Sequence, residues 1–173
     1  MGVLYLIALV LHVVGLTIRD LYELLKRNHK VDPTDARVFG VVFTSMCVMW
    51  LSWFAVGAFA PTRVAVPSAV RWLGAVALLA GTAVSIGGMW QLGSVENIDH
   101  LVTSGLFALV RHPMYLGFVL WILGWCASTG ALACLLLAPF GTASVLWWRG
   151  LEESDLLSRY GEEFRKYQAA TWF

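Results

Sequence analysis

The stretch WLGAVALLAGTAVSIGGMWQL, from Trp72 to Leu92, decides the fold class of this protein. It contains no charged residue, and its length matches the roughly 20 apolar residues that a helix needs to cross the hydrocarbon core of a bilayer. A surface helix of a water-soluble protein would carry charged residues along its exposed face. The stretch therefore predicts a transmembrane helix.

Four further apolar runs have the same character, at Val3–Ile18, Val38–Ala60, Pro113–Ser128 and Ala131–Trp148. The 173-residue chain is 59% hydrophobic and 13% charged, with a mean hydropathy of +0.72, whereas soluble domains are roughly 45–50% apolar and 25% charged. We therefore predict an all-α polytopic membrane protein with about five transmembrane helices. The last two runs are separated only by Thr129 and Gly130, so they should form a tight helical hairpin.

The basic residues predict the orientation of these helices. With five spans, ten of the twelve Lys and Arg residues fall in the first and third connections and the tail, which share one side of the membrane. Basic residues are enriched in cytoplasmic segments. We therefore expect an extracytoplasmic N-terminus and a cytoplasmic C-terminus.

The chain is predicted to be a single domain, with its character changing near residue 93. Residues 1–92 should form three transmembrane helices, 93–112 a cytoplasmic loop, 113–148 the helical hairpin, and 149–173 a cytoplasmic amphipathic tail. A net charge of +1 does not indicate nucleic-acid binding. The three cysteines lie within predicted spans without CxxC spacing, so we predict neither a metal centre nor a disulfide framework.

The end of the polar loop carries groups that are typical of a ligand site. Pro113 suits the first position of a helix and His112 its cap. The first N–H groups of that helix lack helical partners, and its dipole is positive at this end, beside Arg111. We therefore expect an anion site here, with Tyr115 in the first turn. Simpler roles also fit these residues: Arg111 could set topology at the membrane boundary, and His112 could only cap the helix.

The tail predicts an amphipathic helix between Leu151 and Tyr167 with a carboxylate on its apolar face. At 100° per residue one face collects Leu156, Leu157, Tyr160, Phe164 and Tyr167. Glu153 points into the middle of this face and Glu152 lies at its edge. A buried carboxylate needs a partner, which could be Arg111, Arg149 or a cationic ligand. If the helix begins one turn later, both glutamates are simply solvated.

These two features together predict a site for a zwitterionic ligand. S-adenosylmethionine carries a carboxylate, an amine, an adenine ring and a positive sulfonium, and each of these groups has a matching partner among the residues above. A nucleotide or a lipid head group would satisfy the same residues on physical grounds.

Two motifs carry a family resemblance over about the last two fifths of the chain. The run HLVTSGLFALVRHPMYLG, His100–Gly117, is followed by EESDLLSRYGEEFRKY, Glu152–Tyr167. This combination resembles the isoprenylcysteine carboxyl methyltransferase family and its phospholipid methyltransferase relatives. The string RHPxY by itself is less specific, because membrane sterol and steroid reductases carry similar strings.

The resemblance implies an integral membrane enzyme that transfers a methyl group from S-adenosyl-L-methionine. The acceptor would be a lipophilic or prenylated molecule from the bilayer, with a carboxylate methylated at the cytoplasmic face. The implied cofactor-binding residues are His100, Leu101, Val102, Phe107, His112, Pro113, Met114, Tyr115 and Glu152, and the helical wheel adds Glu153. Phe107 stands where the family usually has a tyrosine. Arg149 approximates the basic residue expected before the acidic pair, and we predict that it pairs with the substrate carboxylate in catalysis.

Two other functions are compatible with the sequence. A nicotinamide-dependent membrane reductase of the sterol or steroid type would share the RHPxY string, although the acidic pair does not suit a 2′-phosphate. A non-enzymatic lipid or haem carrier could use His12 and His112 as haem ligands.

Overall fold

The computed structural model describes residues 2–93 and 100–173, so residues 94–99 of the predicted cytoplasmic loop lie outside the description. The described residues form helices only, apart from two isolated β-bridges. In chain order the helices are α1 Gly2–Arg27, α2 Ala36–Ala58, α3 Ser68–Leu92, the short 3-10 helix η1 Gly105–Ala108, α4 Pro113–Thr129, α5 Leu132–Tyr160 and α6 Glu162–Ala170.

The prediction of an all-α polytopic membrane protein is confirmed. Helices α1, α2, α3 and α5 are long and apolar enough to cross a membrane, and α4 is a shorter apolar helix. Large apolar side chains point outward along these helices, including Leu79 at 72% and Leu51 at 70% exposure. An outward apolar surface of this kind suits contact with lipid rather than water.

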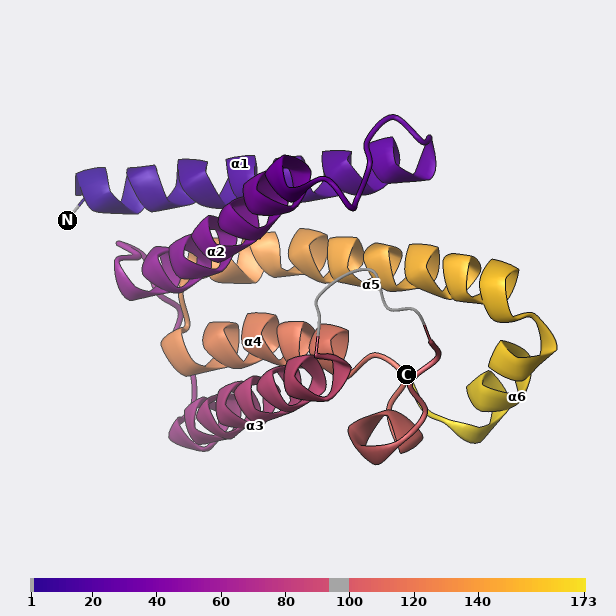
Figure 1. Ribbon diagram of the computed structural model, residues 1–173. Helices are drawn as coiled ribbons and strands as arrows, with labels where there is room; N and C mark the ends of the chain where they lie inside the picture. Colours follow the sequence, from indigo (N-terminus) through magenta and orange to yellow (C-terminus); the bar gives the residue numbers. More distant parts are fainter. Residues whose placement is uncertain (1, 94–99) are drawn as a thin grey trace.

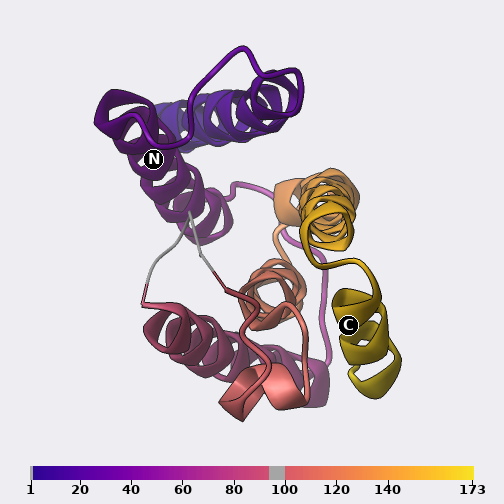
Figure 2. The ribbon, with the colours of Figure 1, turned by 45° about the vertical axis from the view of Figure 1, so that its right-hand side comes forward.

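The helices are arranged as two packed pairs joined by α5 (Figure 1). Helix α1 packs on α2, and α3 packs on α4, while α5 contacts α4, α1 and α2. The turned view shows α4 between α3 and α5 (Figure 2). Helix α6 folds back beside the end of α5, which brings it near η1 and the beginning of α4.

Small residues allow α3 and α4 to pack closely. A Cβ atom built on Gly81 would lie 2.8 Å from the carbonyl oxygen of Gly117, and one built on Gly117 would lie 2.5 Å from the carbonyl oxygen of Gly81. No side chain fits at these distances. The beginning of α4 is therefore held firmly against α3.

The predicted hairpin is also present, and its ends are well defined. Pro113 is the first residue of α4 and His112 its cap, while Gly130 ends α4 in the left-handed conformation, with φ 63°. Helix α5 differs from the prediction because it does not end at Trp148 but continues to Tyr160. The helix continues through Gly150 and ends only before Gly161, whose φ is 51°. The acidic pair thus lies on the same helix as the last span, and the expected amphipathic helix is split at Gly161.

Candidate functional site

The segment before α4 is fixed by pairing with the end of the chain. The backbone N–H of Arg111 donates to the carbonyl of Trp172 at 3.0 Å, and the N–H of Trp172 donates to the carbonyl of Leu109 at 3.1 Å. The N–H of His112 donates to the carbonyl of Phe173 at 3.2 Å. These bonds close one side of the site, and the sequence offered no signal for them.

Arg111 connects three elements through its guanidinium group. Its Nε donates to Glu153 on α5 at 3.1 Å, and its Nη1 donates to the carbonyls of Gln168 at 3.0 Å and Thr171 at 2.6 Å. Its side chain is only 9% exposed. Arg111 therefore does more than mark the membrane boundary, because it holds the loop, α5 and the end of α6 together.

Glu153 provides the negative charge that balances the guanidinium of Arg111. Besides Arg111, its Oε1 lies 3.3 Å from Nε2 of His112 and 3.5 Å from Nη2 of Arg149, and its Oε2 accepts from Nε2 of Gln168 at 3.3 Å. The prediction that a carboxylate on the apolar face needs a partner is confirmed, and Arg111 and Arg149 both contact it. Every oxygen of this carboxylate is engaged within the protein.

A pocket lies in front of these groups and collects most of the residues that were predicted to bind the cofactor. Nine of them line it: His100, Leu101, Val102, Phe107, His112, Pro113, Met114, Tyr115 and Glu152. The structure adds Leu92, Arg111, Leu156 and Tyr167. Glu153 and Arg149 are absent from the lining. The pocket has a volume of about 60 Å³.

The polar groups of the pocket include one accessible carboxylate, that of Glu152, beside His112 and two tyrosine hydroxyls. The side chain of Glu152 is 40% exposed, its Oε2 lies 3.9 Å from Nδ1 of His112, and it is hydrogen-bonded to the hydroxyl of Tyr115. The hydroxyl of Tyr167 donates to the carbonyl of Phe107 at 2.6 Å, and burial raises the pKa of Tyr167 to about 12. Tyr167 therefore stays neutral, which leaves Glu152 to attract a positive charge.

The beginning of α4 offers a complementary feature in the same pocket. Pro113 has no N–H, and the N–H groups of Met114 and Tyr115 precede the first internal hydrogen bond of the helix, in which the N–H of Leu116 donates to the carbonyl of His112. Such a helix end favours an anion. The pocket thus pairs an anion-binding end with a carboxylate, between apolar walls, and suits a zwitterion with an apolar or aromatic part.

Comparison with known families matches this part of the chain to a family model described as phospholipid methyltransferase, over residues 69–163. The chain belongs to the phospholipid methyltransferase family. This finding confirms the predicted relationship, because similar proteins include protein-S-isoprenylcysteine O-methyltransferase of Schizosaccharomyces pombe, which is 36% identical over 84 residues, 44% of this chain and 34% of the relative.

Two further relatives show the breadth of the similarity. Methanethiol S-methyltransferase of Pseudomonas deceptionensis is 38% identical over 63 residues, 36% of this chain and 23% of the relative. Protein-S-isoprenylcysteine O-methyltransferase of Dictyostelium discoideum is 26% identical over 142 residues, 74% of this chain and 56% of the relative. The chain thus spans less than two thirds of the length of each of these relatives. No solved structure matches the chain significantly.

The family match covers α3, α4, α5 and the first residues of α6, and therefore almost all of the pocket. Arg149, which the sequence predicted to be catalytic, lies beside the pocket in this phospholipid methyltransferase family member. Its guanidinium carbon lies 4.7 Å from the ring centre of Phe173, and its Nη2 faces Glu153. Its buried Nε has no hydrogen-bond partner among the described residues.

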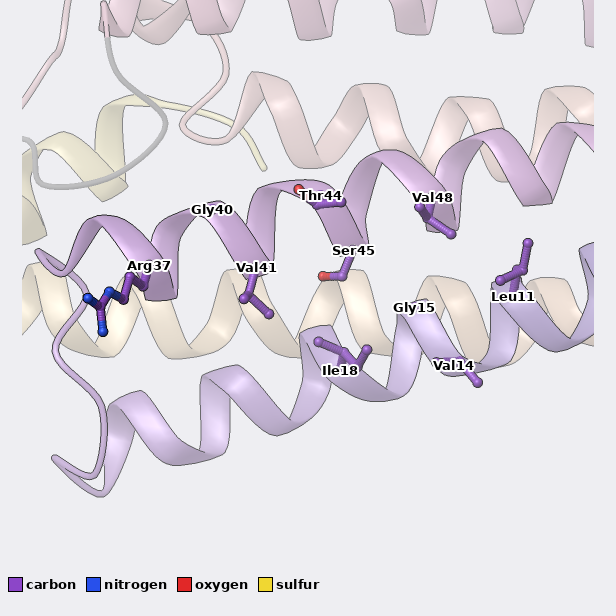
Figure 3. Close-up of a pocket in the computed structure, with 10 residues that line it drawn as sticks. All are labelled: Leu11, Val14, Gly15, Ile18, Arg37, Gly40, Val41, Thr44, Ser45 and Val48. Atoms are coloured by element: carbon purple, nitrogen blue, oxygen red, sulfur yellow. The ribbon is translucent and has the colours of Figure 1, made fainter.

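A larger hollow between α1 and α2 lies outside the family match and has a different character. It has a volume of about 580 Å³, and Figure 3 shows its walls, where apolar side chains such as Ile18, Val41 and Leu11 flank the small residue Gly15. Arg37 stands at one end. The lining contains no carboxylate and no imidazole. This hollow is an open apolar groove of the membrane-facing pair and lacks the groups that a methyl-transfer site needs.

Proposed function

We propose that this protein is an integral membrane methyltransferase that uses S-adenosyl-L-methionine and methylates a lipophilic or prenylated acceptor at the cytoplasmic membrane face. The observation that carries the proposal is the pocket at the beginning of α4, where Glu152 and the free helix N-terminus lie within the segment that matches the family. The two relatives named above as acting on isoprenylcysteine and methanethiol make methyl transfer the reaction to test first.

The residues of the pocket fit S-adenosylmethionine by charge and shape. Glu152 would meet the positive amine and sulfonium, and the N–H groups at the beginning of α4 would meet the carboxylate. Apolar side chains, among them Leu101 and Leu156, would enclose the adenine ring. Because ligand pockets of this class usually measure about 300–1,000 Å³, the pocket of about 60 Å³ has to widen on binding. The wall formed by residues 101–103 has no helical structure, and we propose that it moves to admit the cofactor.

The chemistry requires little more than positioning. When bound, S-adenosylmethionine would supply a methyl group on a positive sulfur, and an electron-rich acceptor atom would bond to the methyl carbon in line while the carbon–sulfur bond breaks and the neutral thioether leaves. The chain has to hold that acceptor atom on the axis and keep water out. A carboxylate acceptor needs no base, and we propose that the guanidinium of Arg149, whose side chain is 26% exposed, pairs with it at the membrane surface. His112 and Glu152 then remain binding residues.

Calorimetry in detergent is the direct test of the proposal. Titration with S-adenosylmethionine and with its demethylated product should give saturable binding, while NADPH should give none. Saturable binding of NADPH without binding of S-adenosylmethionine would favour the reductase instead. His12, which the haem alternative would use, is buried inside the α1–α2 pair, where its Nδ1 donates to the carbonyl of Met49 at 3.1 Å and its ring lies 5.0 Å from the ring of Trp53.

A further inference from the structure

The groove between α1 and α2 is lined by residues that the cofactor pocket does not use. Figure 3 shows that it runs along both helices, with Arg37 at one end and Leu11 and Val48 at the other. Its volume is about 580 Å³. At 1.5 Å per residue, the stretch of α2 from Arg37 to Val48 gives it a length of about 16 Å. A groove of this length and volume can hold a hydrocarbon chain.

The walls of the groove are apolar, and two glycines set its shape. Gly15 lets the helices approach closely, because a Cβ atom built there would lie 2.8 Å from the Cβ of Met49. Gly40 keeps the groove open, since a Cβ atom built there meets no atom within 4 Å. Branched apolar side chains, among them Ile18 and Val41, flank it. The shape and the lining therefore suit an extended apolar chain rather than a compact polar ligand.

The groove begins at the boundary of the membrane and runs into the hydrocarbon core. Helix α1 has no carboxylate, lysine or arginine before Arg19, and α2 has none after Arg37. Such a change from charged to apolar sequence marks the surface of the hydrocarbon core. Ile18 and Arg37 thus lie near this surface, whereas Leu11 and Val48 lie deeper. The groove has the polarity of a membrane lipid, with a charged end at the surface and an apolar length below it.

Arg37 supplies a cation that is available to a ligand. Its side chain is exposed, and within the described part of the chain its guanidinium makes no hydrogen bond or ion pair. Its backbone N–H donates to the carboxylate of Asp35 at 2.7 Å, which caps α2. The other carboxylate of this connection, that of Asp32, accepts from the N–H and the hydroxyl of Thr34. Lys30 adds exposed positive charge. Basic groups between transmembrane helices at a membrane surface bind anionic head groups.

We infer that this groove binds an anionic phospholipid, whose phosphate meets Arg37 and one of whose acyl chains lies along the groove toward Leu11 and Val48. The charge of the head group and the apolar chain each have a matching partner in the groove. The lipid is a resident ligand and not the methyl acceptor, because the groove shares no residue with the cofactor pocket and lies outside the family match over residues 69–163. The inference goes beyond the proposed function and does not depend on it.

Two substitutions separate the contact with the head group from the contact with the chain. Arg37→Gln removes the cation and should lower retention of phosphatidylglycerol about fivefold, the value of one basic residue near a membrane surface. Gly40→Leu places a side chain in the groove and should lower retention of anionic and zwitterionic lipids alike. Arg71→Gln is the matched control, because Arg71 is also an exposed arginine in the first turn of an apolar helix but does not line the groove.

The experiment is native mass spectrometry of the purified protein, released from detergent that contains equimolar phosphatidylglycerol and phosphatidylcholine with identical acyl chains. The wild type should retain one phosphatidylglycerol in preference to phosphatidylcholine, and Arg71→Gln should behave in the same way. Arg37→Gln should lose the preference, and Gly40→Leu should retain little of either lipid. Melting curves recorded before the lipids are added show whether each variant is folded.

Several results would overturn the inference. Equal retention of the two lipids by the wild type would do so, as would a preference that persists unchanged in Arg37→Gln. Unchanged retention in Gly40→Leu would also do so, and this variant decides the matter if Arg37→Gln does not fold. A lipid-free dimer that Gly40→Leu converts to a monomer would make the groove an interface between two copies of the chain and overturn the lipid assignment. None of these measurements involves S-adenosylmethionine, so they leave the proposed function to its own test.

Discussion

Replacing the two adjacent glutamates one at a time separates ligand binding from assembly. Glu152 lines the pocket, whereas Glu153 is enclosed by Arg111, His112, Arg149 and Gln168. Glu152→Gln should therefore weaken the binding of S-adenosylmethionine and leave the melting temperature unchanged. Glu153→Gln should lower the melting temperature, and it should weaken binding only to the extent that the pocket loosens.

The expected magnitudes follow from the exposure of the two side chains. A hydrogen bond to a charged group is worth about 1.5–3 kcal/mol. Because Glu152 is 40% exposed, solvent screening favours the lower part of that range, about 1.5–2 kcal/mol, which corresponds to about 10- to 30-fold in Kd. Glu153 is 16% exposed and Arg111 is 9% exposed. Glu153→Gln leaves Arg111 without its opposite charge, which should lower the free energy of unfolding by about 3 kcal/mol. This loss corresponds to a melting temperature lower by about 6–12 °C.

Calorimetry and thermal melting on the same detergent sample measure both quantities. Glu162→Gln is a suitable control, because this residue carries an exposed carboxylate on α6 that pairs with the exposed Arg165, and it should change neither quantity. The assignment would be refuted if Glu152→Gln bound the cofactor normally while Glu153→Gln lost affinity at an unchanged melting temperature.

Three further changes test other parts of the site and the fold. The side chain of His112 makes no capping hydrogen bond, so His112→Ala should reduce cofactor affinity and methyl transfer; normal affinity with a lowered melting temperature would instead limit His112 to its contact with Glu153. Gly117→Val should unfold the α3–α4 pair, since a Cβ atom there would lie 1.9 Å from the hydroxyl of Ser85; Gly150→Ala, with open space around it, should melt like the wild type. A cysteine placed at the exposed Ala169 in a cysteine-free background should resist an impermeant reagent on intact cells, and labelling from outside would reverse the proposed orientation.

Much of the fold follows from hydropathy, because few backbone structures can span a bilayer. Backbone groups in hydrocarbon must be paired within a helix or a closed barrel, so runs of apolar residues read directly as helices. Local signals were also sufficient at the beginning of α4, where His112 and Pro113 mark the boundary. Hydropathy failed at the end of α5, because the helix continues beyond the apolar residues and its polarity changes without a change in backbone conformation.

The site was predictable where it depends on single elements and unpredictable where it depends on contacts distant in sequence. Nothing local indicates that Leu109–His112 pairs with Trp172 and Phe173, since the two segments lie about 60 residues apart and neither has a strand-like pattern. Leu156 and Tyr167 were assigned to an apolar face, and that they line the pocket became visible only once α6 was folded back.

The helical wheel also placed the two glutamates correctly and yet left their roles open. A residue in the middle of an apolar face points into the protein, where it needs partners, and Glu153 finds them in Arg111 and Arg149. A residue at the edge of the face, about 100° away, points toward a gap between elements, and Glu152 lines the pocket there. Two adjacent carboxylates on one helix can therefore serve assembly and ligand binding at once. It follows that loss of activity after mutation of either glutamate says little about its role, unless affinity and stability are measured together.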